Sequence, residues 1–263
     1  MWKDNRISEV FIKKKGIGMI ALADIPANTL IMKELPISIV KINNQTVSDI
    51  FQILYDVLSD PNKKSLFEKF LPNSINEFES HRNNLMKEFH KLKKSRLNNV
   101  YQFINNNFTS DEILLYGAKY MCNAFEFNNG SAILINGAKF NHSCVPNVIF
   151  VSDENYMYFY TVRNIKTGEE LTDNYVDIMS NTKTRKNRLF NQYGFDCQCE
   201  RCIGSDKLFY QEVEKIQSSK FYFSNQISVN HRKKLQQNSK NLKKKSQKKQ
   251  SKQLQNNSKT TPK

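Results

Sequence analysis

Short apolar segments separated by turn-forming residues open the chain. The segments 10–12 and 19–22 flank a turn at 13–18, and a second turn lies at 24–28. Glycine, proline and asparagine at such breaks favour hairpins over helices. Residues 7–40 are therefore predicted to form short strands joined by tight turns.

The spacing of apolar positions changes between residues 46 and 120. Apolar residues there recur every three or four positions, which is the period of one buried helix face. Breaks at 60–62 and 71–73, each containing a proline, divide the stretch into separate helices. Ser110 or Asp111 is expected to cap the last of them. The clearest apolar positions are Ile50, Ile53, Leu54, Val57, Leu58, Leu85, Phe89 and Leu92.

Strand-like sequence then returns in the second half of the chain. Residues 156–162 are rich in aromatic and β-branched side chains, which favour strands. Residues 182–193 have a basic, helical pattern, and 211–217 are predicted to form one more helix. The other predicted strands are 132–135, 147–151 and the strand that follows the turn at 164–171.

Basic residues are concentrated at the C-terminal end. The 263-residue chain has a formal net charge of +15, yet residues 230–263 hold twelve Lys and Arg and no acidic residue. Subtracting these twelve leaves +3 for everything before them. Only Leu235, Leu242 and Leu254 are apolar in this tail. It cannot bury enough surface to offset its chain entropy, so we expect it to be disordered.

Two interpretations of the basic tail stay open. It is either a solvated, low-complexity extension, or a nuclear-import signal and weak nucleic-acid-binding arm centred on Lys243–Lys245 and Lys248–Lys249. The sequence has no apolar run of membrane-spanning length and no signal region at Met1. We expect a soluble monomer, cytoplasmic and/or nuclear, with no membrane partner.

Three of the five cysteines, Cys197, Cys199 and Cys202, lie within six residues. Three thiolates are one ligand short of a tetrahedral zinc site, and in a reducing compartment clustered cysteines favour metal over disulfides. Cys144, in a polar, turn-forming stretch, is the best candidate for the fourth ligand. Cys122 is left over and is predicted to be a small core side chain.

Four motifs carry further candidate chemistry, although each has an ordinary structural interpretation. A Gly-x-Gly is typical of a hairpin turn, Asn-His of a satisfied turn, and single tyrosines or phenylalanines of a core. The motifs are Gly16-Ile17-Gly18, the stretch Asn141-His142-Ser143-Cys144-Val145-Pro146-Asn147, the stretch Gly168–Tyr175, and Tyr193–Cys202.

Together and in this order, the motifs resemble those of SET-domain protein lysine methyltransferases. The likeness is greatest to the MYND-associated branch, whose SET domain is split by a helical insertion, and it covers roughly 7–40 and 115–204. Ile17 departs from that branch, which commonly has a basic residue there. The predicted insertion has no Cys/His cluster, so the MYND zinc finger is lacking.

The resemblance implies a mainly β fold with an α insertion. Several small β-sheets would surround a threaded, pseudoknot-like C-terminal segment and a post-SET zinc site. The SET domain would occupy 1–180, split by the helical insertion at about 43–112. A post-SET zinc segment at 181–204, a helical segment at 205–229 and the basic tail at 230–263 would follow.

The resemblance also implies transfer of a methyl group from S-adenosylmethionine to a lysine side chain of a histone or non-histone protein. Tyr175 matches the catalytic tyrosine, which orients the neutral amine, and no His or Asp general base is expected. One structural Zn²⁺ would be held by Cys144, Cys197, Cys199 and Cys202. The implied cofactor contacts are Lys15, Gly16, Gly18, Asn123, Asn141, His142, Tyr193 and Phe195.

The alternative function is a noncatalytic, zinc-stabilised SET-like module. Such a module would engage chromatin or nucleic acid through the basic tail. The altered position Ile17 and the reduced insertion leave this open, whereas Tyr175, Asn141 and His142 favour the enzyme.

Overall fold

The chain consists of two compact units. The computed structural model describes residues 1–41, 48–76, 78–128 and 130–228. Met1–Lys220 form the first unit, and Phe221–Lys263 form the second, in which residues 221–228 are helical. The tail predicted at 230–263 lies outside the described residues. Within the part that is described, no helix has the length and apolarity needed to cross a membrane.

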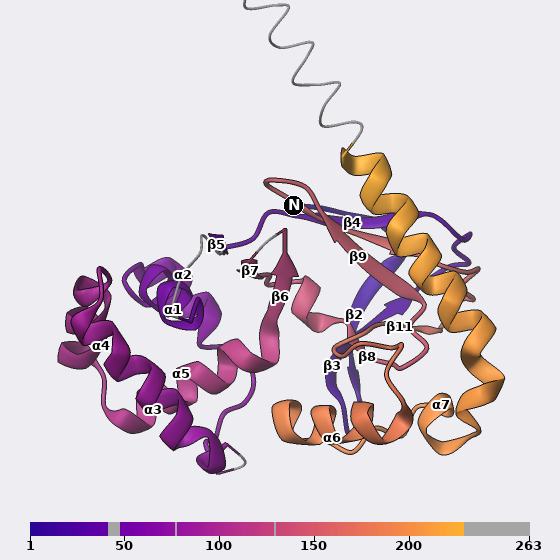
Figure 1. Cartoon of the computed structure of the whole chain (residues 1–263). Coiled ribbons are helices and arrows are strands. Elements are labelled where there is room, and N and C mark those ends of the chain that lie inside the picture. Colours follow the sequence, from indigo (N-terminus) through magenta and orange to yellow (C-terminus); the bar gives the residue numbers. More distant parts are fainter. Residues whose placement is uncertain (42–47, 77, 129, 229–263) are drawn as a thin grey trace, which may run out of the picture. The chain divides into compact units, whose positions relative to one another are not determined.

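Three small β-sheets organise the first unit (Figure 1). The first sheet has the order β1 (Trp2–Lys3), β4 (Leu30–Glu34), β10 (Met157–Thr161) and β9 (Val148–Ser152). The second has the order β2 (Ile7–Ile12), β3 (Gly16–Ala21), β11 (Glu170–Asp173) and β8 (Asn141–His142). The third has the order β5 (Ser38–Lys41), β7 (Gly130–Ile133) and β6 (Ala124–Phe127). The predicted mainly β fold with several small sheets is confirmed.

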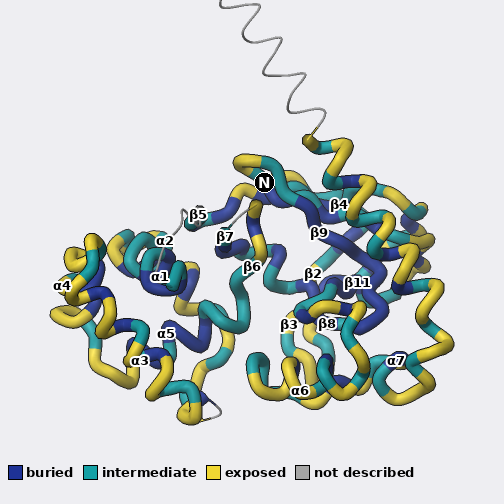
Figure 2. Tube along the Cα trace, viewed as in Figure 1, coloured by how far each residue is buried: buried dark blue, intermediate teal, exposed yellow. Residues whose placement is uncertain are grey.

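The sheets enclose an apolar core, drawn in dark blue in Figure 2. The aromatic stretch predicted at 156–162 forms β10, and its Phe159 ring stacks on Phe140 with 5.0 Å between centroids. Met19 and Leu171 join the same core and are fully buried. The apolar faces of strands from both halves of the sequence therefore pack against each other.

The helical region between β5 and β6 has a core of its own. All six apolar residues of α1 (Ile50–Leu58) are buried, as its helical period predicts. The Asp60 side chain accepts from two backbone N–H groups of α2 (Pro61–Phe67), which explains the helix start there. The remaining elements of the region are η1 (Glu79–His81), α3 (Arg82–Lys91), η2 (Leu92–Lys94), α4 (Asn98–Asn107) and α5 (Ser110–Asn123).

The cap of α5 differs from the prediction. Thr109, rather than Ser110 or Asp111, is the N-cap, because its hydroxyl accepts from the Glu112 backbone while the Glu112 carboxylate accepts from Thr109. This reciprocal capping box satisfies two N–H groups that the helix itself cannot pair. At its other end α5 passes directly into β6 at Ala124.

After the sheets, the chain continues through short helices. The basic pattern at 182–193 forms α6 (Thr182–Tyr193), as predicted. Residues 210–220 are helical and end the first unit. The other short elements are η3 (Gly137–Lys139), α7 (Glu200–Ile203) and η4 (Asp206–Phe209).

The parallel pair β8–β11 positions the motifs. Thr172 lies opposite Asn141 and Asp173 opposite His142, and the Ser143 N–H donates to the Asp173 carbonyl at 2.9 Å. Parallel neighbours cannot be joined by a tight hairpin, so this contact brings together segments that are remote in sequence. The Asn-His strand consequently lies beside the segment that ends at Tyr175.

Thr109→Ala should lower the free energy of unfolding by about 1 kcal/mol, because it removes the side-chain acceptor of the α5 cap. Thr109→Ser keeps that acceptor and is the matched control. Urea denaturation of both variants measures the difference. Equal midpoints for the alanine variant and the unaltered chain would show that the capping box contributes nothing.

Candidate active site and metal centre

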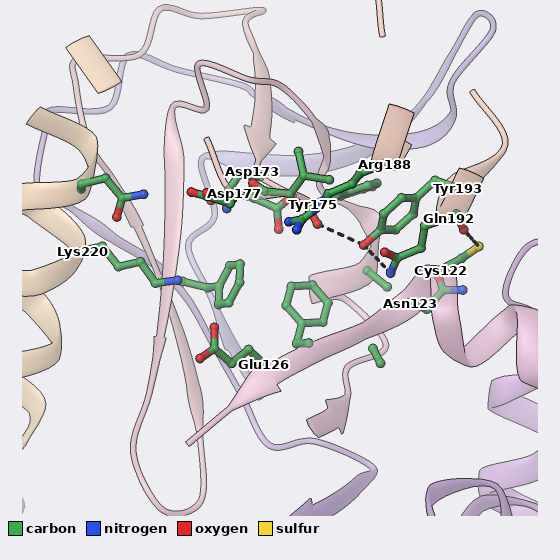
Figure 3. Close-up of a pocket in the computed structure, with 17 residues that line it drawn as sticks. Cys122, Asn123, Glu126, Asp173, Tyr175, Asp177, Arg188, Gln192, Tyr193 and Lys220 are labelled. Carbon is green, nitrogen blue, oxygen red and sulfur yellow. Dashed lines mark hydrogen bonds between the residues drawn. The ribbon is translucent and has the colours of Figure 1, made fainter. Parts of the chain in front are cut away.

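A cavity of about 440 Å³ lies in the first unit (Figure 3). Residues from the end of α5, from β6, from β11 and the loop after it, and from α6 line it. Three of the predicted site residues, Asn123, Tyr175 and Tyr193, are among them. Its volume suits a side chain or a small ligand.

Tyr175 lies at this cavity with its hydroxyl group fixed. The hydroxyl donates to the Phe140 carbonyl oxygen at 2.8 Å, and the ring packs against Tyr193 with 4.9 Å between centroids. Burial, followed by the nearby Asp173 carboxylate, raises the pKa of Tyr175 well above its usual value. Because the hydroxyl hydrogen is committed to Phe140, the phenolic oxygen can only accept from a group that enters the cavity.

His142 connects Tyr175 to the cysteines. Its Nδ1 accepts from the Tyr175 backbone N–H at 3.0 Å, so the ring hydrogen must be on Nε2. Nε2 lies 3.2 Å from the Cys144 sulfur and donates to it. Burial is the main cause that lowers the pKa of His142 to about 4, and the imidazole is therefore neutral at neutral pH. His142 was predicted only as a cofactor contact, so this side-chain bridge was missed.

The predicted donor-site residues Lys15, Gly18 and Asn141 meet around Glu170. The Glu170 carboxylate accepts from the Asn141 amide at 3.0 Å and from the Lys15 ammonium at 2.6 Å. A Cβ on Gly18 would lie 2.5 Å from the Ile12 side chain and 2.6 Å from the Asn141 amide nitrogen, so both side chains would have to shift. Glycine at this position lets Asn141 pack closely against strand β3.

Gly16 and Asn123 lie on either side of Leu71. Gly16 has a φ of +80°, which only glycine adopts readily, and a Cβ there would contact the Leu71 side chain at 4.0 Å. The Asn123 amide donates to the Leu71 carbonyl at 2.7 Å and to the Lys119 carbonyl at 2.8 Å. Asn123 thus ties the end of α5 to a loop of the helical region.

Tyr193, the last residue of α6, and Phe195, just after it, form an aromatic group with His142 and Tyr175. The Tyr193 hydroxyl donates to the Tyr175 carbonyl at 3.2 Å. The Phe195 ring lies 6.1 Å from the His142 ring and 6.5 Å from that of Tyr175. Burial raises the pKa of Tyr193, with smaller effects from Cys122 and Asp173.

The predicted metal ligands Cys144, Cys197, Cys199 and Cys202 converge. Their sulfur atoms all lie within 4.8 Å of one another, and Cys144 and Cys197 are buried. Four thiolates at Zn–S distances of about 2.3 Å form a closed tetrahedral site, so the donor set fits zinc. Hydrogen bonds within the cluster lower the pKa of Cys199 and raise the pKa of Cys144. For Cys197, the hydrogen bond with Cys144 lowers the pKa, but the one with Cys199 and burial raise it above its usual value.

Two buried arginines lie beside the cysteine cluster and were not predicted. Arg201 donates to the carbonyls of Cys144 and Ile178, and its Nε donates to Asp206 at 2.5 Å. Arg185 also pairs with Asp206, at 3.3 Å, and its Nη2 lies 4.0 Å from the Cys202 sulfur. Four thiolates around one Zn²⁺ carry a net negative charge, which these guanidinium groups would balance.

Two further predictions need correction or completion. Cys122 is not a core side chain: it is half-buried, lines the cavity and has its sulfur 3.4 Å from the Gln192 carbonyl oxygen. Glu170 and Asp173 also line or organise the site. The acidic pair in the Gly-Glu-Glu-Leu motif was the available signal for Glu170, whereas nothing local marked Asp173.

The small sheets, the parallel β8–β11 pair and the tyrosine at the cavity define a SET-type fold. Residues 16–176, more than half of the chain, match the family model described as the SET domain. The chain therefore belongs to the SET-domain family.

Known methyltransferases are similar to this chain over part of their length. N-lysine methyltransferase SMYD2 of Homo sapiens is 34% identical over 149 residues, which are 53% of this chain and 34% of that protein. N-lysine methyltransferase SMYD2-A of Xenopus laevis is 33% identical over 149 residues, which are again 53% of this chain and 34% of that protein. The match thus spans about a third of the length of these relatives.

Solved structures show the same fold. The SET domain of LSMT bound to lysine and AdoHcy has a TM-score of 0.54 at 16% identity and covers 80% of this chain and 59% of that chain. The same domain bound to MeLysine and AdoHcy has a TM-score of 0.57.

Cys199→Ser should reduce zinc affinity by more than roughly 100-fold, which is the upper end of the loss seen when only an outer-shell partner is removed. The melting temperature should fall with it, because a metal held by the four cysteines would join α7 to the segment after β8. Zinc content by mass spectrometry and thermal unfolding measure both. Cys122→Ser, which removes a cysteine outside the cluster, is the control. A chain that purifies without zinc would contradict the assignment.

Proposed function

We propose that the chain is a protein lysine N-methyltransferase that uses S-adenosylmethionine. One observation carries the proposal: the Tyr175 hydroxyl oxygen, restricted to accepting by its bond to Phe140, lies at a cavity also lined by Asp173, whose strand pairs with Asn141–His142. The stretch 16–176 matches the SET-domain model, the similar relatives are N-lysine methyltransferases, and solved neighbours hold lysine and AdoHcy.

The donor would lie against the glycine-rich start of β3 and the Asn141–His142 strand. Bound S-adenosylmethionine supplies a methyl group on a positively charged sulfur. The residues that would hold it are Lys15, Gly16, Gly18, Asn123, Asn141, His142, Tyr193 and Phe195. The absent Cβ of Gly18 leaves room for close backbone approach, Lys15 and Asn141 supply polar contacts, and Phe195 supplies an aromatic face.

The acceptor would be the side chain of an exposed lysine on a histone or another protein. It must be neutral to attack, although the unperturbed lysine pKa is about 10.4. Burial in the cavity disfavours the ammonium. The oxygen of Tyr175 would accept a hydrogen bond from the amine and hold it in line with the methyl carbon. Orientation of this kind can replace about 7–11 kcal/mol of the barrier.

One structural Zn²⁺ at the four cysteines completes the proposal. Neither the basic tail's weak nucleic-acid contact nor its role in nuclear localisation is supported by a described residue, and both stay proposals for residues 230–263. A monomer in the cytoplasm and/or nucleus is likewise proposed. The noncatalytic alternative gains no supporting observation in the described part of the chain.

Tyr175→Phe should lower kcat by roughly 100-fold, the scale of losing one preorganised polar group. The assay mixes the zinc-loaded chain with labelled S-adenosylmethionine and a cell-extract protein mixture, and mass spectrometry locates methylated lysines. Tyr158→Phe is the control, because that hydroxyl bonds Asp153 in the first sheet. Equal methylation by Tyr175→Phe would refute the role of Tyr175, and no methylation by the unaltered chain would refute the proposed function.

A further inference from the structure

Asp173 is a buried carboxylate that lacks a partner. The residue is 1% exposed, and neither of its carboxylate oxygens has a hydrogen-bond partner among the described residues. It lines the same cavity as Tyr175 and Tyr193 (Figure 3). A buried carboxylate without a partner lowers stability, and an apolar side chain of similar size would avoid that cost. A group that enters the cavity comes next to this residue.

The backbone holds Asp173 firmly in this position. Asp173 is the last residue of β11, in register with His142 of β8, and its carbonyl accepts from Ser143. Two residues later comes Tyr175, whose ring faces the same cavity. The carboxyl and phenol groups are close enough for the charge of Asp173 to be the second cause, after burial, that raises the pKa of Tyr175.

Charged groups from other elements surround the cavity without pairing with Asp173. Lys220, from the helical residues 210–220, has its ammonium 4.7 Å over the Phe150 ring. Burial is the largest effect on the pKa of Asp173 and raises it well above the usual value, whereas the smaller effects of its own backbone N–H and of the Lys220 charge lower it. The other ionisable groups that line the cavity are Arg188 and Tyr193 of α6, Cys122 of α5, Glu126 of β6, and Asp177.

We propose that Asp173 accepts the proton of the acceptor lysine inside the cavity. This inference rests on the proposed function and replaces the expectation that no Asp general base takes part. In this proposal, the missing partner of the Asp173 carboxylate is the primary ammonium group of the lysine. Tyr175 keeps its separate role, because its oxygen can only accept a hydrogen bond while the carboxylate can take the proton itself.

The proton transfer balances. The lysine ammonium gives one proton to the Asp173 carboxylate, which leaves a neutral amine and a neutral carboxylic acid. Because Asp173 is almost fully buried, this neutral pair avoids the desolvation cost of two separate charges there. The amine lone pair then forms the N–C bond as the C–S bond of the donor breaks and its electron pair stays on sulfur. The product is a methylammonium, which leaves as a cation. Asp173 then gives its proton to water, which restores the carboxylate for the next turnover.

The proposal predicts a particular dependence of kcat/KM on pH. The reaction needs one proton shared between Asp173 and the lysine amine, as when Asp173 is ionised and the free lysine is charged. Below the pKa of Asp173 both groups are protonated, and above about pH 10.4 both have lost their proton. The unaltered chain should therefore show a plateau between these limits and a decline on both sides.

Asp173→Asn removes the proton acceptor and keeps the size of the side chain. In this variant the lysine amine must already be neutral when it binds, so kcat/KM should rise about tenfold per pH unit until about pH 10.4. Near pH 8 its kcat/KM should be roughly 100-fold below that of the unaltered chain. Asp173→Glu restores a carboxylate and should recover the plateau at a reduced rate. Asp177→Asn, which removes a cavity carboxylate that already has partners, should keep the plateau shape. A purely structural role for Asp173 predicts the same profile shape for all variants and would overturn the proposal.

A second readout does not depend on methyl transfer. The zinc-loaded chain, labelled with ¹³C at aspartate carboxyl carbons, is saturated with S-adenosylhomocysteine and titrated with free L-lysine as the probe. The Asp173 signal is the one that Asp173→Asn lacks. At a pH about two units above the titration midpoint of Asp173 without lysine, added lysine should shift the Asp173 signal to the chemical shift of the protonated carboxyl group. A signal that stays ionised, or that lysine leaves unchanged, would overturn the inference even where methylation is observed. An unaltered chain that binds lysine and protonates Asp173 but methylates nothing would instead contradict only the proposed function.

Discussion

The neutral His142 imidazole is the contact on which the arrangement of the site depends. One ring nitrogen accepts from the backbone of Tyr175 at 3.0 Å, and the other lies 3.2 Å from the sulfur of Cys144. A protonated ring could not accept from Tyr175, and burial prevents that protonation at neutral pH. A structural metal at the cysteines would therefore act on the tyrosine through a single side chain.

The other parts of the site also depend on the cysteine cluster and on burial. Tyr193 and Phe195 precede the cysteine cluster in sequence and pack with Tyr175 and His142, so closing the cluster also places these rings. The parallel β8–β11 pair then sets Asp173 beside His142. Burial is the shared cause that raises the pKa of Asp173 and Tyr175 and lowers that of His142. Burial next to Asp173 and Tyr175 would likewise disfavour the charge of an ammonium that enters the cavity.

Local patterns in the sequence predicted the helices well, and the cysteine spacing predicted one long-range contact, but the burial of Asp173 was not predicted. The basic pattern at 182–193 coincides with α6, and the four cysteines converge as predicted. The α5 cap could not be chosen locally, because Thr109, Ser110 and Asp111 are all capping residues and only the extended backbone of Thr109 decides between them. Asp173 resembles a polar strand end, and its burial follows from pairing with β8, which no local pattern contains.

Calorimetric titration with S-adenosylmethionine tests most directly the claim that the metal centre organises the donor site. The zinc-loaded chain should bind one molecule per chain, and binding should be lost after a chelator removes the metal and return when zinc is restored. Circular dichroism before and after chelation shows whether the sheets persist. Equal affinity in the loaded and stripped chains would contradict the account.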